Sequence, residues 1–325
     1  MVKWHYCSLV SYFVLKLFMF NFLPGRLIGL LSFACYSINT VFWLMPILIF
    51  SLLKATIPLN FSKKIFSYLL DLMASNWVAV NSLVQALFNK TKITVTGLES
   101  LSIDDWYLVI ANHQSWVDIV VLQRVLHGRV PFLKFFLKKE LIYVPLLGLA
   151  WWALDFPFMK RYSQAFLRKN PHLRGKDLIT TRKACAKFKH KPVSVMNFIE
   201  GTRFTDKKHH KQNSPFQYLL KPKSGGISFV LDAMGEHLTQ IVDVTICYPD
   251  GIPNFSDFLS GQIDNVCVDI KTYDIDKELG HINFSDRNDR ILFQKWLTEF
   301  WHAKDARLAT MQSHYNVSEN KRVDD

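Results

Sequence analysis

Cysteine is scarce in this chain and never stands in a metal-binding pattern. Five cysteines are scattered over 325 residues, an odd number with no C-x-x-C pair. They are Cys7, Cys35, Cys185, Cys247 and Cys267. This spacing argues against a disulfide framework and gives no zinc-binding signature. We therefore expect reduced, packed thiols, a catalytic domain in the cytosol, and no metal site.

Two catalytic signatures are also missing. The chain lacks G-x-x-x-x-G-K-[ST], the phosphate-binding loop of nucleotide hydrolases, so nucleotide hydrolysis is disfavoured. It also lacks the G-x-S-x-G turn that presents a nucleophilic serine in α/β-hydrolases. Any catalysis by this chain must rest on other residues.

Charge is absent from one long segment. Residues 27–53 contain no charged residue, and about 20 apolar residues suffice to span a bilayer. Pro46 lies inside this run, where a membrane helix tolerates it. We expect a membrane anchor over 1–58, an amphipathic helical connector over 59–90, a catalytic-looking domain over 91–312 and a frayed polar tail over 313–325.

The rest of the chain is strongly basic. Its net charge of +12 indicates an anionic partner. Aromatic residues make up 14% of the sequence, with 26 Phe and nine Trp, which favours a phospholipid surface over nucleic acid. We therefore expect contact with membrane phospholipid and none with nucleic acid.

Strands and helices alternate after residue 91, which is typical of an α/β fold. We expect an open mixed sheet flanked by helices and preceded by the N-terminal membrane-anchoring helical segment. In such sheets, functional sites gather at the carboxyl ends of the strands. The expected strands are 93–96, 107–111, 193–199, 241–248 and 266–273, and the expected helices are 115–126, 176–189, 225–234 and 287–311.

A histidine stands at the end of the second expected strand. His113 follows the apolar run up to Ala111, and Ser115 and Asp118 have the spacing of a helix-capping pair. A strand-turn-helix corner can bring the Asp118 carboxylate to the imidazole, fixing its tautomer and leaving one nitrogen free as a base. The alternative is a loop histidine and an aspartate that complements the helix dipole.

A second polar cluster follows the strand that ends at Ile199. Gly201 permits a tight turn, and Arg203 offers a planar fork suited to a phosphate. An ordinary turn with a solvated arginine is the alternative for this cluster.

Basic residues recur near two further segments. Arg161 ends the apolar and basic segment 132–161, which suits a hydrophobic channel or a membrane-surface segment, with plain core packing as the alternative. Lys221 and Lys223 precede an expected helix N-terminus, a plausible anion site. We interpret 207–211, a run of lysines and histidines, as a solvated loop.

These motifs, in this order, resemble the blocks of the glycerolipid acyltransferases, the 1-acylglycerol-3-phosphate acyltransferase family. The resemblance covers about residues 90–275 and rests on Asn112-His113-x4-Asp118, on a Phe-x-x-Arg block ending at Arg161, and on Phe198-Ile199-Glu200-Gly201-Thr202-Arg203.

Two further segments, Asp243-Val244-Thr245-Ile246-x-Tyr248 and Lys221-Pro222-Lys223, look like the subgroup with lysocardiolipin acyltransferases and their bacterial relatives. The chain has Asp155 where many members have glycine, and Pro222-Lys223 where relatives have Pro-Arg. Both departures bear on the choice of acceptor.

The resemblance implies a reaction. His113, oriented by Asp118, would act as general base on the free hydroxyl of a lysophospholipid, which attacks the thioester of acyl-CoA or an acyl carrier protein without an acyl-enzyme. Lysophosphatidic acid is the expected acceptor, and acyl-CoA is a co-substrate, so no cofactor is expected. The domain would face the cytoplasm at the cytoplasmic (inner) membrane.

The resemblance also assigns the acceptor site. Arg203 and Arg161 would hold the acceptor phosphate, with Glu200, Gly201 and Thr202 shaping the pocket. Lys221 and Lys223 are further candidates for phosphate contacts. Asn112 would set the geometry of the turn, and residues 141–158 would line the acyl path.

Two other functions compete with acyl transfer. A hydrolase would use Ser115 as nucleophile, although that serine is expected to cap its helix. A membrane-anchored, non-catalytic binder of anionic lipid would need only the positive charge and would not depend on His113.

Overall fold

The computed structural model describes residues 22–57, 59–159, 191–284 and 286–323, together with positions 169, 182, 185 and 188. Arg161 and almost all of the expected helix 176–189 lie outside the described residues.

A mixed six-stranded sheet forms the centre of the domain. Its strand order is β1-β8-β7-β2-β6-β3, and every neighbouring pair is parallel except β7 with β8. The strands are β1 (Lys92–Thr96), β2 (Tyr107–Ala111), β3 (Leu133–Phe135), β6 (Ser194–Phe198), β7 (Gln240–Cys247) and β8 (Asn265–Asp274). The predicted α/β class is confirmed. All five expected strands are present, and β3 was missed because it has only three residues.

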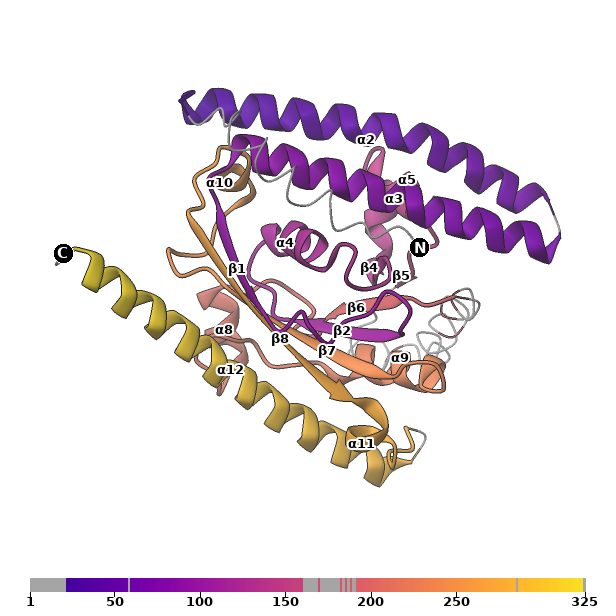
Figure 1. Cartoon of the computed structure of the whole chain (residues 1–325). Coiled ribbons are helices and arrows are strands. Elements are labelled where there is room, and N and C mark those ends of the chain that lie inside the picture. Colours follow the sequence, from indigo (N-terminus) through magenta and orange to yellow (C-terminus); the bar gives the residue numbers. More distant parts are fainter. Residues whose placement is uncertain are drawn as a thin grey trace.

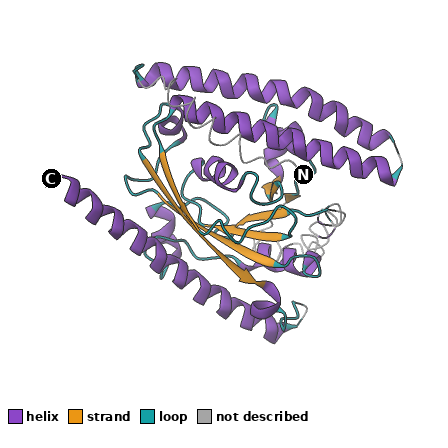
Figure 2. Cartoon of the chain, in the orientation of Figure 1, coloured by secondary structure: helices purple, strands orange, loops and turns teal. Residues whose placement is uncertain are grey.

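Helices cover both faces of the sheet (Figures 1 and 2). On one face, α4 (Val117–Leu126) lies between the sheet and the long helix α3, and on the other face α12 crosses the sheet. The remaining described elements are α2 (Gly25–Thr56), α3 (Asn60–Phe88), β4 (Leu137–Lys138), η1 (Lys139–Tyr143), α5 (Leu147–Ala153), β5 (Phe158–Met159), α8 (Asp206–Gln212), α9 (Ser224–Met234), α10 (Phe255–Leu259), α11 (Ile275–Leu279) and α12 (Arg287–Val323).

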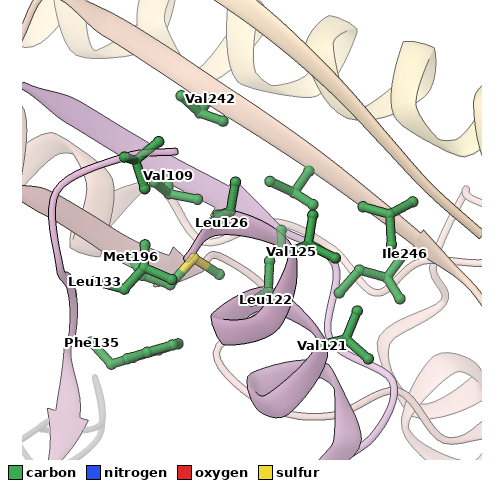
Figure 3. Packing of buried hydrophobic residues seen from close by; sticks show 14 of the residues in the cluster. Val109, Val121, Leu122, Val125, Leu126, Leu133, Phe135, Met196, Val242 and Ile246 are labelled. Atoms are coloured by element: carbon green, nitrogen blue, oxygen red, sulfur yellow. The ribbon is translucent and has the colours of Figure 1, made fainter. Parts of the chain in front are cut away.

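Strand β2 is the central element that sets the position of the site. All five of its residues are buried, as expected for a strand covered on both faces. Figure 3 shows Val121, Leu122 and Val125 of α4 packed against the face of the sheet that α4 covers. In the strand register, Ala111 lies beside Phe198 on β6 and beside Val244 on β7. The segments that follow β2, β6 and β7 therefore meet at one edge.

The N-terminal helices form a pair along the outside of the domain. Within the described part of the chain, α2 is the one helix long and apolar enough to cross a membrane. It lies side by side with α3 (Figure 1), and Asn39 Nδ2 donates across the pair to Asn81 Oδ1 at 2.8 Å. The last turn of α2 is tied to the domain by an ion pair between Lys54 and Asp155. Its other end packs against α10.

Asp155 occupies a glycine-like backbone conformation. Its φ is +60°, in the region that side chains other than glycine rarely adopt. This is the position where many members of the resembling family have glycine. The chain therefore keeps the turn while adding a carboxylate that pairs with Lys54.

Two local expectations were wrong. The tail expected from 313 belongs to α12, which runs to Val323 because no glycine or proline interrupts the chain after Gly280. The expected loop 207–211 is part of helix α8, which starts because the Thr205 side chain accepts from Lys208 N. Lys134, in the segment 132–161, is buried and its Nζ pairs with Asp71 at 2.9 Å, so the core-packing alternative holds for this residue.

Candidate active site

Asn112 ends strand β2 and fixes the start of the turn. Its side-chain amide donates to the Ile246 carbonyl at 2.8 Å and accepts from the Ile246 N–H at 2.9 Å. The side-chain amide thus makes the two hydrogen bonds to Ile246 that a backbone peptide of β2 would otherwise make to β7. The fully buried Asn112 sets the turn geometry, as its position predicted.

His113 and Asp118 are brought together by the corner between β2 and α4. His113 Nδ1 lies 2.9 Å from Asp118 Oδ2, which also accepts from the backbone N–H groups of Gln114 at 2.6 Å and Ser115 at 2.9 Å. A carboxylate at Nδ1 favours the tautomer with the proton on that nitrogen. No described residue hydrogen-bonds Nε2, which is therefore available as a base.

The imidazole has an apolar neighbour on one face. The ring of Phe198, the last residue of β6, stacks on His113 with centroids 3.9 Å apart and planes 14° apart. The His113 side chain retains 13% exposure while Asp118 is fully buried. The base is thus held rigidly and still reaches the surface of the domain.

Glu200 links the motifs from inside the protein. Its Oε1 accepts from the backbone N–H of His113 at 2.7 Å, and its Oε2 accepts from that of Leu220 at 3.0 Å. Burial raises the pKa of Glu200 to about 8, against the opposing effect of the two N–H donors. Glu200 therefore acts on the pocket through the backbone of its neighbours, because its own carboxyl group is fully buried.

The turn after Glu200 carries the arginine back toward α4. Gly201 has a φ of +70°, which makes glycine the favoured residue there. Phe204 N then donates to the His113 carbonyl at 2.7 Å, which fixes the turn beside the histidine. The Arg203 guanidinium carbon lies 4.7 Å from the ring centre of Trp116. Among the described residues, no carboxylate forms an ion pair with Arg203.

Lysines on helix α8 and in the segment just before helix α9 lie next to this turn. Lys208 Nζ on α8 donates to Thr202 Oγ1 at 2.9 Å and to the Arg203 carbonyl at 2.7 Å, so Thr202 is engaged with a cation. Lys223 is the residue before α9, and its N–H donates to the Ile199 carbonyl at 2.7 Å. Lys221 is exposed two residues earlier. The N-terminus of α9 thus lies beside the segment Phe198–Arg203. The predicted anion site at this N-terminus requires that proximity.

The hydroxyl of Ser115 is already engaged. Ser115 is buried; its Oγ donates to the Pro253 carbonyl at 2.5 Å and accepts from Val117 N at 3.1 Å. A nucleophilic serine would instead give its proton to the base. This geometry argues against the serine-hydrolase alternative.

Sequence reasoning missed several groups around the pair. Phe198, Trp116 and Lys208 were given no role, and Tyr248 was noted only as part of a resembling segment. Tyr248 Oη donates to Asp118 Oδ1 at 2.7 Å. The one sequence signal that could have found it is its place at the end of the expected strand 241–248, because functional sites gather at the carboxyl ends of such strands.

Fold and site together define the class of protein: an α/β domain with a hydrogen-bonded histidine–aspartate pair at the carboxyl edge of its sheet and an arginine nearby. Residues 92–249, from the start of β1 to just after Tyr248, match the family model described as Acyltransferase. Residues 92–249 therefore form a domain of this acyltransferase family, and the chain is an acyltransferase.

Several curated proteins resemble the chain over most of its length. An uncharacterized acyltransferase of Saccharomyces cerevisiae is 28% identical over 81% of this chain and 72% of its own length. Lysocardiolipin acyltransferase 1 of Mus musculus is 27% identical over 69% of this chain, which spans 58% of the mouse protein. A probable 1-acyl-sn-glycerol-3-phosphate acyltransferase 5 of Arabidopsis thaliana is 24% identical over 85% of this chain and 72% of its own length.

A solved structure shares the fold. It is the 1-acyl-sn-glycerophosphate acyltransferase of Thermotoga maritima, with a TM-score of 0.51 and 18% identity. The match covers 88% of this chain and 96% of the bacterial one.

Proposed function

We propose that this acyltransferase transfers a fatty acyl chain from acyl-CoA to the free hydroxyl of a lysophospholipid, with lysophosphatidic acid as the first candidate acceptor. The observation that carries the proposal is the His113–Asp118 pair, whose free Nε2 lies at the same edge as Arg203. The names of the mouse and Arabidopsis relatives support this class of acceptor. Acyl carrier protein is the alternative carrier of the thioester.

The reaction needs no acyl-enzyme, because the acceptor supplies the nucleophile. His113 Nε2 takes the proton of the acceptor hydroxyl as its oxygen attacks the thioester carbon. The carbon–sulfur bond then breaks, and the same nitrogen returns the proton to the leaving thiolate. A positioned base of this kind contributes roughly 10²–10⁴-fold to the rate, and the buried Asp118 carboxylate stabilises the imidazolium that forms.

Arg203 is proposed to bind the acceptor phosphate. Its guanidinium is stacked on Trp116 rather than paired with a described carboxylate, so it can form a bidentate pair with a phosphate. The N-terminus of α9 with Lys221 and Lys223 can add to this site. Arg161 keeps its proposed role from the sequence alone.

An aromatic route leads from the histidine toward the outer helices. Phe198, which stacks on His113, lies 6.3 Å from Phe135 between ring centres, and Phe135 lies 6.3 Å from Phe156. Beyond Phe156, the segment around α5 exposes large apolar side chains: Tyr143, Leu146, Leu149 and Trp152. We assign this route to the acyl chain.

The α2–α3 pair is proposed to hold the domain on a membrane. From Ile38 onward, exposed apolar residues of α2 recur every three or four positions, as in Phe42, Met45, Ile49 and Leu52. Both ends of this helix, about 48 Å long, contact the domain, so the helix lies along it and presents its side to lipid. With acyl-CoA as donor, the domain would face the cytoplasm.

The direct test is acceptor-dependent release of CoA thiol by the purified, detergent-solubilised full chain. We expect release from a long-chain acyl-CoA only when a lysophospholipid is added, together with the diacyl product. His113→Ala should abolish both. Release without acceptor would indicate a thioesterase, and no release with any lysophospholipid would support a non-catalytic lipid binder.

A further inference from the structure

Asp118 receives hydrogen bonds on both carboxylate oxygens. Oδ2 accepts from His113 Nδ1 and from two backbone N–H groups, while the hydrogen bond to Oδ1 comes from Tyr248 Oη at 2.7 Å. Asp118 is fully buried and Tyr248 is 4% exposed, so water has little access to replace this phenol. Tyr248 thus completes the hydrogen bonding of the group that orients the base.

The donors to the two carboxylate oxygens of Asp118 come from different segments of the chain. His113 and the turn amides belong to the β2–α4 corner, whereas Tyr248 follows β7, the neighbouring strand. Two-sided bonding fixes the rotation of the carboxylate as well as its place. A donor on Oδ1 also withdraws negative charge from the oxygen that faces the imidazole.

We propose that Tyr248 is a positioning residue of the acyltransferase reaction, acting through Asp118 to hold His113 in its orientation and to set its basicity. The inference rests on the proposed function, because it assigns Tyr248 a part in the same proton transfer. Burial, and then the charge of Asp118, raises the pKa of Tyr248 well above its usual value, so the hydroxyl remains a donor throughout the working range of pH.

The test compares two tyrosines that differ in what they touch. Tyr248→Phe removes the phenol oxygen from Asp118. Tyr107→Phe is the matched control, because Tyr107 is also buried. Its hydroxyl donates to Asp105 and accepts from the Ser102 N–H. Tyr107 begins β2, whereas His113 follows the other end of that strand.

We expect Tyr248→Phe to lower kcat about tenfold or more while leaving KM for both substrates unchanged. The acid limb of the kcat profile should move to higher pH, by about half a unit or more, because Asp118 keeps more charge to stabilise the imidazolium. The other titratable or charged groups around the pair are Glu200 behind the His113 backbone and Arg203 over Trp116, and neither is altered.

A double variant separates this role from packing. In the Asp118→Asn background, adding Tyr248→Phe should cost little more, because the carboxylate through which it acts is gone. As a second probe that keeps the side chain's shape, 3-fluorotyrosine at position 248 donates more strongly and should move the acid limb to lower pH.

Three outcomes would overturn the inference: a Tyr248→Phe variant with normal kcat and acid limb, an equal loss in the Asp118→Asn background, or no shift with fluorotyrosine. If the wild type itself transfers no acyl group, the proposed function fails instead, and the wild-type and His113→Ala arms distinguish the two failures.

Discussion

Glu200 gives the sharpest prediction about how the site is built. Its two carboxyl oxygens each accept a hydrogen bond from one backbone N–H, that of His113 and that of Leu220, and the Glu200 side chain is not exposed to solvent. Replacing Glu200 by Gln keeps the shape but turns one acceptor into an NH₂ donor. One buried N–H then loses its partner, at a cost of about 1–3 kcal/mol. Glu200→Ala removes both acceptors and leaves a cavity, so it should cost more.

The pH dependence of this cost has a definite sign. The pKa of Glu200 rises from 4.5 to about 8 in the folded protein, so the folded state binds the proton more tightly. The contribution of this protonated Glu200 to the free energy of unfolding is fully present below about pH 4.5 and is lost as pH rises through about 8. At 1.36 kcal/mol per unit, the limiting loss is roughly 5 kcal/mol. Because this loss exceeds the substitution's cost of about 1–3 kcal/mol, the stability advantage of wild type over Glu200→Gln should shrink as pH rises from about 5 and should reverse before the pH reaches about 8.

Thermal unfolding in detergent across this range measures the effect. The matched control is Glu299→Gln, the same chemical change at an exposed residue whose one ion pair within the described part of the chain is with Lys295 at 3.9 Å. This variant should be nearly as stable as wild type at every pH. The Glu200→Gln variant should also lose kcat, since the His113 backbone shifts. A variant as stable as wild type at about pH 5 and equally active would refute the reasoning.

Three further predictions concern single side chains. Ser115→Ala should keep most of the transferase activity and lose about 1 kcal/mol of stability, as measured by CoA release and thermal unfolding, because its hydroxyl bonds Pro253; complete loss of activity would restore the serine-hydrolase alternative. Arg203→Gln should lower kcat/KM for the lysophospholipid about 10–100-fold with KM for acyl-CoA unchanged, and equal effects on both substrates would remove its phosphate role. Phe42→Ser on α2 should weaken binding to anionic vesicles by about tenfold or more, whereas Leu292→Ser, at similar exposure on α12, should not; equal losses in a flotation assay would contradict the assigned membrane face.

The sequence predicted most clearly what depends on local pattern. Strand β2 was predictable because five consecutive apolar residues precede Asn112, and the strand end located His113. The approach of Asp118 to His113 followed from the capping spacing of the corner. The long run without charge predicted an apolar segment over 27–53, which lies within the single helix α2.

What could not be predicted depends on partners far away in the sequence. The burial of Lys134 could not be predicted from its own segment, because its partner Asp71 lies 63 positions earlier. Glu200 looked like a pocket residue because nothing in its own motif shows that its acceptors face the His113 and Leu220 backbones. The role of Tyr248 depends on β7 lying beside β2, which the order of strands along the chain does not give.

The central claim is direct transfer to the acceptor with His113 as base, and intact-mass measurement tests it most directly. The enzyme is mixed with a long-chain acyl-CoA without acceptor, quenched and weighed, and then lysophosphatidic acid is added to a parallel sample. The account predicts an unmodified protein in the first sample, diacyl product in the second, and no product with His113→Ala. A protein carrying one acyl chain that passes to the acceptor, or full product formation by His113→Ala, would contradict it.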